Sequence, residues 1–211
     1  MSTFIIIFLV SLILITLIVP LFIRIGRKIN LVGEDIHKPD RPLIPKTGGP
    51  ALIITVFMSL LLYLILEKLS IEILVLIFSS FIAALVGLIE DFKGEINPKV
   101  KPILLLFAGI PILAFSTFIP RPILPFIGAT RLTKIYPFLI LASYPVVCNA
   151  VNSIDVLNGS VSFTSIAFFT AVLVVSILHN LEYPLIISIV MIGALIGFAL
   201  YNKYPSKVFV G

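Results

Sequence analysis

Two acidic residues, followed about ten residues later by lysine, form the most chemically suggestive segment, GLIEDFKGEINPKVKP at residues 87–102. Glu90 and Asp91 end an apolar run, where a carboxylate is costly unless a metal ion, a lysine or water compensates it. Carboxylate oxygens bind the hard cation Mg²⁺, and the ammonium of Lys99 or Lys101 can steady a substrate phosphate. The segment therefore fits magnesium-dependent phosphoryl transfer, with a solvated helix end as the alternative.

A second group of polar side chains follows an apolar run in CNAVNSIDVLNGS, residues 148–160. Asn149 and Asn152 are three residues apart and share one helix face, which Asp155 and Asn158 continue if the helix persists. Amide and carboxylate oxygens coordinate Mg²⁺, and an amide can pair with the edge of a nucleobase. The alternative is a polar contact between helices, but a carboxylate at the membrane edge favours the chemical interpretation.

Two further polar segments lie between or after apolar runs. The segment GEDIHKPDRPLIPKTGGPAL, residues 33–52, contains prolines and a glycine pair that exclude a regular helix. Its cationic side chains Lys38, Arg41 and Lys46 suit phosphates, because Arg offers a planar fork of donors and Lys a compact charge. A positively charged membrane anchor is the alternative for this loop. The ending YNKYPSKVFVG, residues 201–211, is by itself typical of an interfacial anchor.

The elements that position these segments are long apolar runs. Of the 211 residues, 60% are hydrophobic and only 12% are charged, whereas soluble domains have about 25% charged residues. The runs match the roughly 20 residues that a helix needs to cross a hydrocarbon core, and they lack the alternation of a membrane barrel. We predict an all-α integral membrane protein, a single domain over residues 1–211. Its transmembrane helices, about seven in number, are Phe4–Ile23, Pro50–Leu66, Ile71–Ile89, Pro102–Ile119, Tyr136–Asn152, Val161–Leu178 and Pro184–Tyr201.

The basic residues predict how the chain sits in the membrane. With the N-terminus outside, eleven of the fifteen fall on one face, which the positive-inside rule assigns to the cytoplasm. The eleven are Arg24, Arg27, Lys28, Lys38, Arg41, Lys46, Lys93, Lys99, Lys101, Lys203 and Lys207. The other face keeps Lys68, Arg121, Arg131 and Lys134. All four polar segments share the eleven-residue face, so we expect any chemistry on the cytoplasmic side.

Several classes of site are excluded by the same composition. The single cysteine, Cys148, leaves no internal disulfide, and His37 and His179 are too far apart in sequence to indicate a histidine metal site. The net charge of +5 comes from short loops between spans, so topology explains it and we expect no nucleic-acid partner.

In this order and on one face, the segments DIHKPDRPLIPKTGG, GLIEDFKGEINPKVK, NAVNSIDVLNG and YNKYPSKVFVG resemble those of the polyprenyl-phosphate N-acetylhexosamine-1-phosphate transferases. The ending YPSKVFVG and the asparagine of VLNG are most similar to the archaeal and eukaryotic branch. That branch transfers N-acetylglucosamine 1-phosphate from UDP-GlcNAc to dolichyl phosphate. The resemblance implies that lipid phosphate and UDP-sugar give lipid diphosphate sugar and UMP, with Mg²⁺ as cofactor, at the start of lipid-linked glycan assembly. The expected membrane is the cell membrane of a prokaryote or the endoplasmic reticulum of a eukaryote.

The resemblance also assigns roles to residues. Asp91 matches the second aspartate of the family's acidic pair and Glu90 replaces the first, so both are catalytic candidates, with Asp91 as base or as organiser of the metal. Lys101 matches the lysine that holds substrate phosphate, although a one-residue difference in loop length leaves Lys99 open. Asn152 matches a magnesium ligand, which Asp91 would join. The residues expected to bind substrate are Lys38, Arg41, Lys46, Asp155, Asn158 and Gly159, of which the last two match positions near the uridine.

Two departures from the family pattern qualify these expectations. Val156 stands where the family usually has glycine, close to the nucleotide. After the position of Gly211 the family continues with a magnesium-binding aspartate and further spans, so we expect a C-terminally truncated chain with weak metal binding and little turnover. A catalytically dead relative, or a non-enzymatic transporter or lipid-binding subunit, is the alternative. The sugar, the lipid length and the oligomeric state, a homodimer included, stay open.

Overall fold

The computed structural model describes residues 2–35, 38–67, 70–94, 96–115, 123–124, 126, 128–129, 135–155 and 157–211. The helices are α1 (Ser2–Lys28), α2 (Gly48–Leu66), α3 (Ile71–Lys93), α4 (Val100–Leu106), η1 (Phe107–Gly109), α5 (Ile110–Phe115), α6 (Tyr136–Ile154), α7 (Ser160–Leu178) and α8 (Glu182–Asn202). Two antiparallel hairpins pair β1 (Val32–Glu34) with β2 (Leu43–Pro45) and β3 (Ile123–Leu124) with β4 (Gly128–Ala129). Helices α1, α2, α3, α6, α7 and α8 are long and apolar enough to cross a membrane. The prediction of an all-α, multi-pass membrane protein is confirmed.

The fourth predicted span, Pro102–Ile119, has a different form. Residues Val100–Phe115 make a shorter apolar helix composed of α4, η1 and α5, and the end of the predicted span lies outside the described residues. The interruption has a local cause, because Pro111 has no N–H for the carbonyl four residues earlier. The N–H of Ile110 bonds instead to the carbonyl three residues back, which tightens the helix at η1.

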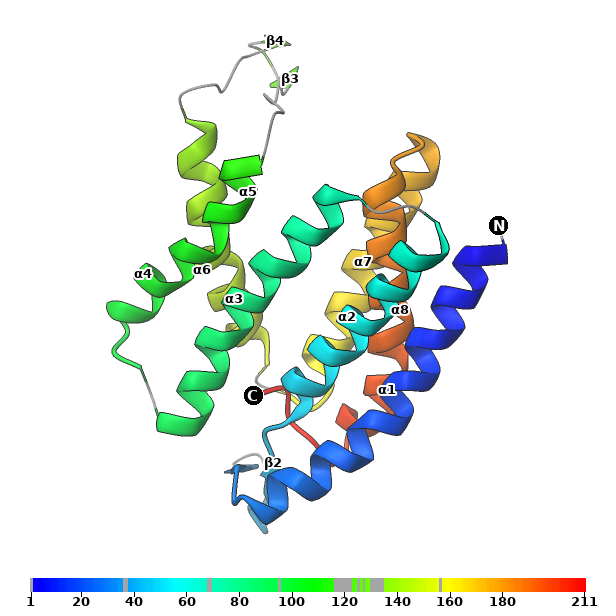
Figure 1. Ribbon diagram of the computed structural model, residues 1–211. Helices are drawn as coiled ribbons and strands as arrows, with labels where there is room; N and C mark the ends of the chain where they lie inside the picture. Colours follow the sequence, from blue (N-terminus) through cyan, green and yellow to red (C-terminus); the bar gives the residue numbers. More distant parts are fainter. Residues whose placement is uncertain are drawn as a thin grey trace.

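Helices α1, α2, α7 and α8 pack together as one group, in which α8 contacts the other three (Figure 1). Close packing of α8 on α1 depends on two glycines four residues apart, which is a common device of membrane helices. A Cβ at Gly193 would collide with Ser11 Oγ, and a Cβ at Gly197 would collide with Ile15 Cγ2. Ser11 Oγ also donates a hydrogen bond of 2.9 Å to the carbonyl of Val190, so a polar contact reinforces this helix pair.

Helices α3, α4, α5 and α6 form a second group beside the first (Figure 1). Contacts of α2 with α3 and of α6 with α7 join the two groups. Many large apolar side chains on the outer surface, such as Leu17, Ile65 and Phe138, are exposed. Exposed apolar side chains are expected on helices that face lipid.

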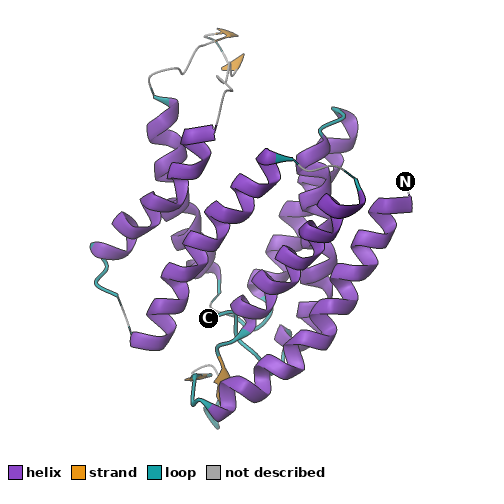
Figure 2. Cartoon of the chain, viewed as in Figure 1, coloured by secondary structure: helices purple, strands orange, loops and turns teal. Residues whose placement is uncertain are grey.

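The tail after α8 folds back against β2 and the start of α2, among the loops in Figure 2. Phe209 N–H donates to the carbonyl of Pro45 at 2.9 Å, while Gly48 and Gly49 donate to the carbonyls of Phe209 and Val210 at 2.9 and 2.6 Å. A Cβ at Gly48 would lie 2.6 Å from the Phe209 oxygen, so only glycine permits this approach. The tail carbonyls thus satisfy the first N–H groups of α2, which have no partner within the helix.

A buried amide at the end of α8 fastens the tail. Asn202 is fully buried, and its Nδ2 donates to the carbonyl of Val208 at 3.0 Å. Its Oδ1 accepts a hydrogen bond of 2.8 Å from Ser162 Oγ on α7. One side chain therefore joins α7, α8 and the tail.

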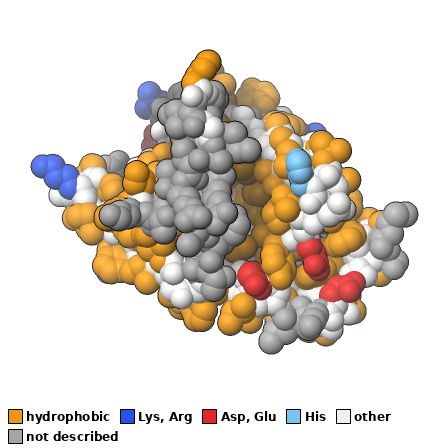
Figure 3. Space-filling view, turned by 90° about the horizontal axis from the view of Figure 1, so that it is seen from above, with side chains coloured by type: hydrophobic (Ala, Val, Ile, Leu, Met, Phe, Trp, Pro, Cys, Tyr) orange, Lys and Arg blue, Asp and Glu red, His pale blue; other side chains and the backbone are white. Residues whose placement is uncertain are grey.

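The basic residues predicted for one face lie together at the end of the bundle where α1, α3 and α8 finish and α2 and α4 begin. The four assigned to the other face, Lys68, Arg121, Arg131 and Lys134, lie outside the described residues. Figure 3 shows the opposite end of the bundle, where acidic side chains lie among apolar ones. Near that end, the connection from α2 to α3 and the start of α3 contain Glu67 and Glu72, and α8 begins with Glu182. The assignment of the basic end to the cytoplasm stays a prediction.

Candidate active site

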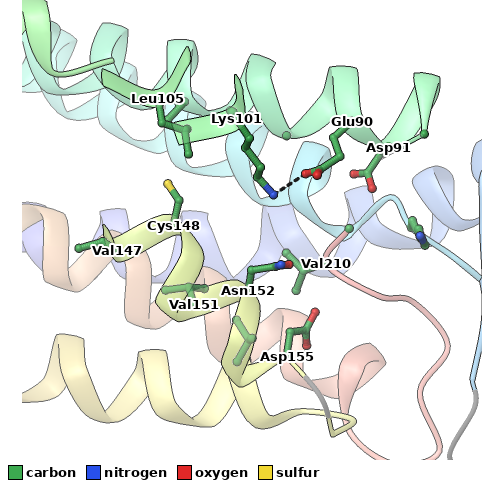
Figure 4. A pocket seen from close by; sticks show the side chains of 17 residues that line it. Glu90, Asp91, Lys101, Leu105, Val147, Cys148, Val151, Asn152, Asp155 and Val210 are labelled. Atoms are coloured by element: carbon green, nitrogen blue, oxygen red, sulfur yellow. Dashed lines mark hydrogen bonds and ion pairs between the residues drawn. The ribbon is translucent and has the colours of Figure 1, made fainter. Parts of the chain in front are cut away.

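A cavity of about 590 Å³ lies at the basic end and brings together residues from separate parts of the chain. Its walls come from α3, α4, α6, the start of α7, the loop before α2 and the tail. Figure 4 shows acidic and basic side chains of α3 and α4 facing the polar side chains of α6. The predicted site residues that line the cavity are Lys46, Glu90, Asp91, Lys101, Asn152 and Asp155.

Glu90 and Lys101 form an ion pair across the connection between α3 and α4. Lys101 Nζ donates to Glu90 Oε2 at 2.5 Å, and the two side chains are 17% and 26% exposed. Lys101 is therefore the lysine that enters the cavity, whereas Lys99 is exposed at the start of α4. The partly buried ammonium keeps a carboxylate as its partner and still faces the cavity (Figure 4).

Asp91 faces the tail and the loop before α2. A Cβ at Gly211 would lie 2.5 Å from Asp91 Oδ2 and 3.2 Å from the carbonyl of Lys46. Lys46 lines the same cavity and contributes positive charge near this carboxylate. The two residues of the acidic pair therefore have different neighbours: Glu90 is paired with Lys101, and Asp91 lies beside the tail.

On α6, polar side chains one turn apart point into the cavity. Cys148 and Asn152 are four residues apart and Asp155 follows three residues later, so all lie on the same side of the helix (Figure 4). Burial raises the pKa of the Asp155 carboxyl above its ordinary value, so a nearby cation would stabilise its charged form. The predicted stripe does not extend to Asn158, because α6 ends at Ile154.

The remaining predicted substrate residues do not line the cavity. Lys38 forms a 3.0 Å ion pair with Asp35, and Asn158 Nδ2 donates to the same carboxylate at 3.1 Å. Arg41 is exposed in the loop. Gly159 starts α7 with φ of 89°, a left-handed conformation that glycine adopts without strain. Val156 lies outside the described residues.

Sequence reasoning missed two parts of the wall. Cys148 had been considered only for disulfides, although its spacing of four from Asn152 indicates the same helix face. Val210 and Gly211 line the cavity through a tail that is held by backbone hydrogen bonds. No side-chain pattern signals such contacts.

Comparison with known proteins identifies the family. The model of glycosyl transferase family 4 matches residues 73–211, which include the acidic pair, Lys101, the α6 stripe and the tail. The chain belongs to glycosyl transferase family 4.

Relatives within this family carry names of membrane phosphotransferases. A UDP-N-acetylglucosamine–dolichyl-phosphate N-acetylglucosaminephosphotransferase of Saccharolobus solfataricus is 31% identical over 90% of this chain and 60% of its own length. A phospho-N-acetylmuramoyl-pentapeptide-transferase of Streptococcus pneumoniae is 29% identical over 94% of this chain and 65% of its own length. The enzyme of the same name from Streptococcus sanguinis is 28% identical over 92% of this chain and 64% of its own length. The chain thus spans less than two thirds of these relatives.

The oxygen donors of the cavity fit a magnesium site that has few protein ligands. Among the described residues no three acidic, histidine or cysteine side chains are grouped as a metal cage. Mg²⁺ commonly binds through one or two carboxylates, water and substrate phosphates. Asp91, Asn152 and Asp155 line one cavity with two lysines, which is a donor set of that kind.

Proposed function

We propose that the chain forms part of an enzyme that transfers N-acetylglucosamine 1-phosphate from UDP-GlcNAc to a polyprenyl phosphate of the dolichyl type. An oxygen of the lipid phosphate attacks the phosphorus that carries the sugar. The new bond joins the two phosphates of the lipid product, and the bond between that phosphorus and the bridging oxygen of UMP breaks. UMP leaves with the electron pair, so no oxidant or further reactant is needed.

The observation that carries this proposal is the composition of the cavity. Two lysines, two acidic residues of α3, Asn152 of α6 and Asp155 directly after α6 face one space at the basic end of a membrane bundle. Two anionic substrates repel each other, and cationic groups are the means of bringing them together. The attacking phosphate is already ionised near neutral pH, so positioning and charge neutralisation are the main requirements.

Each polar group then has a role in the proposed reaction. Lys101 and Lys46 bind substrate phosphates, with Glu90 holding the Lys101 side chain in place. Asp91, Asn152 and Asp155 would hold Mg²⁺, which would supply positive charge to the diphosphate. Asp91 alternatively accepts a proton from the attacking phosphate, and both roles require its carboxylate in the cavity.

The finer assignments rest on similarity. UDP-GlcNAc and dolichyl phosphate appear in the name of the Saccharolobus relative, whereas the streptococcal relatives are named for N-acetylmuramoyl-pentapeptide. The basic end supports a cytoplasmic active face. We place the reaction in the cell membrane of a prokaryote or the endoplasmic reticulum of a eukaryote.

The test is an assay of the complete product of the gene that encodes this chain, purified in detergent with dolichyl phosphate and radiolabelled UDP-GlcNAc. We expect labelled lipid and UMP in equal amounts, abolished by EDTA and restored by Mg²⁺. Asp91→Asn should lose the activity, and Asp40→Asn, an exposed residue of the first loop, should keep it. Absence of product with every UDP-sugar would instead support a catalytically dead relative or a transport or lipid-binding role.

A further inference from the structure

Lys46 enters the cavity from the segment that joins β2 to α2, whereas Lys101 enters it from a helix. A lysine ammonium stands on a flexible four-carbon stem, and ordering that stem costs rotamer entropy. A lysine outside a helix therefore needs other contacts to hold its stem if the ammonium is to stay in one place.

Hydrogen bonds fix the main chain on both sides of Lys46. Its N–H donates to the carbonyl of Leu31 at 3.1 Å, and the carbonyl before it accepts from Phe209 N–H at 2.9 Å. Thr47 is buried, and its Oγ1 donates to the carbonyl of Phe22 in α1 at 3.0 Å. The backbone is thus held by β1, α1 and the tail, so only the side chain of Lys46 is free to adjust.

The stem of Lys46 lies directly over Gly33 of β1. A Cβ at Gly33 would lie 2.5 Å from Lys46 Cε, and 3.5 and 3.6 Å from its Cδ and Cγ. Carbon atoms that are not bonded to each other pack at about 3.5 to 4.0 Å, so the stem occupies the space that a side chain would take. Gly33 is paired with Ile44 in the hairpin, which keeps the strand in register beneath the stem.

The path over Gly33 leads to the cavity. Lys46 lines the cavity together with Asp91, and its positive charge acts on that carboxylate. Lys46 is only partly buried, as expected for a lysine that covers its stem with protein and keeps its ammonium accessible.

We propose that Gly33 is a positioning residue, whose missing side chain lets the Lys46 stem cross β1 and so directs the ammonium to a substrate phosphate in the cavity. The phosphate-binding role of Lys46 in this inference rests on the proposed function. The positioning itself rests on the packing of the stem over the hairpin.

The consequence of a side chain at this position follows from the contact. In Gly33→Ala the new methyl group meets the far end of a flexible side chain, so the lysine moves and the hairpin persists. Moving an ammonium from about 4 to about 6 Å from a phosphate removes a third of the Coulomb energy, which is about tenfold in affinity at an effective dielectric constant of about 20. We expect an effect of this size.

The experiment measures initial rates of the complete gene product with UDP-GlcNAc, dolichyl phosphate and Mg²⁺, each substrate being varied in turn. Lys46→Ala first shows which kinetic parameter of which substrate depends on the lysine. Gly33→Ala should change the same parameter in the same direction, by about tenfold. Glu34→Gln is the control, because Glu34 is exposed and its side chain points to the opposite face of the strand; its rates should stay at the wild-type value.

A double-mutant cycle separates positioning from a general effect on the hairpin. In Lys46→Ala no stem remains to be displaced, so adding Gly33→Ala should cause no further loss. If Gly33→Ala alone does not fold, the double variant should fold, because the colliding stem is gone. Additive losses, a double variant that still fails to fold, or Lys46→Ala with wild-type rates would overturn the proposal.

Labelling of Lys46 with an amine-reactive reagent, followed by mass spectrometry, reports the position of the ammonium without any substrate. The labelling rate should rise in Gly33→Ala, because the ammonium leaves the cavity wall, and should stay unchanged in Glu34→Gln. If the wild-type protein makes no product, the proposed function fails and the labelling rates alone decide on Gly33. If the wild-type protein is active and Gly33→Ala matches it in rates and labelling, only this inference fails.

Discussion

Replacing Lys101 by methionine should damage the proposed reaction while it keeps the shape of the cavity. Methionine retains the length of the apolar stem and removes the ammonium. The side chain is 17% exposed, so its charge acts in a partly screened environment. A unit charge about 4 Å from a phosphate is worth up to about 4 kcal/mol at an effective dielectric constant of 20. Removing one group that stabilises transition-state charge costs about 10²- to 10³-fold in rate, and we expect a loss of kcat/KM in this range.

The ion pair with Glu90 makes a second, sharper expectation. In Lys101→Met the Glu90 carboxylate loses its partner and adds negative charge where an anionic substrate must bind. Two like charges about 6 Å apart at a dielectric constant of about 40 repel by roughly 1.4 kcal/mol, a factor of about ten. Lys101→Met combined with Glu90→Gln should therefore recover about tenfold over Lys101→Met alone.

The assay is the initial rate of labelled lipid formation at several UDP-GlcNAc concentrations. Lys99→Met is the matched control, because Lys99 is exposed two residues away and lies outside the cavity, and its activity should stay near the wild-type value. A Lys101→Met enzyme within threefold of wild type, or a Lys99→Met enzyme that loses activity instead, would refute the assignment of the phosphate-binding lysine.

Two further outcomes follow from the fold. Asn202→Ala leaves the partners of two buried hydrogen bonds unsatisfied, so it should lower the free energy of unfolding by about 2 to 4 kcal/mol. Denaturant titration in detergent measures this loss. An unchanged unfolding midpoint would show that the amide does not fasten the tail. In a Cys148→Ser background, Asp40→Cys should react with an impermeant maleimide from the cytoplasmic side and His179→Cys from the opposite side. Labelling of both from one side would contradict the predicted orientation.

The helices were predictable because each long apolar run has one stable solution in lipid, in which a helix satisfies its own backbone hydrogen bonds. The break at η1 was harder to predict, since a count of apolar residues takes no account of the missing N–H of Pro111. The division of the helices into two groups was not predictable either. It depends on contacts between distant segments, such as Gly193 and Gly197 of α8 against α1. A single sequence taken alone does not reveal which helices meet.

For the candidate site, the sequence allowed us to select polar residues, but it did not reveal which residues contact one another. The acidic pair, Lys101 and Asn152 were predicted as one site, and the structure brings them to one cavity. Lys38 and Asn158 were predicted to bind substrate, and that stays a prediction; their shared partner Asp35 was not foreseen. The reason is that a carboxylate in a charged loop has the same sequence signature whether it is buried or exposed.

The central claim is that the cavity performs transfer of a phosphosugar rather than of the sugar alone, and the fate of the phosphate bonded to the sugar tests it most directly. The complete gene product would be incubated with dolichyl phosphate, Mg²⁺ and UDP-GlcNAc that carries ³²P in that phosphate. Our account predicts that the label enters the lipid phase, that unlabelled UMP remains in water, and that Asp91→Asn prevents both. Label that stays in the aqueous phase as UDP while the sugar reaches the lipid, or lipid labelling that persists unchanged in Asp91→Asn, would contradict it.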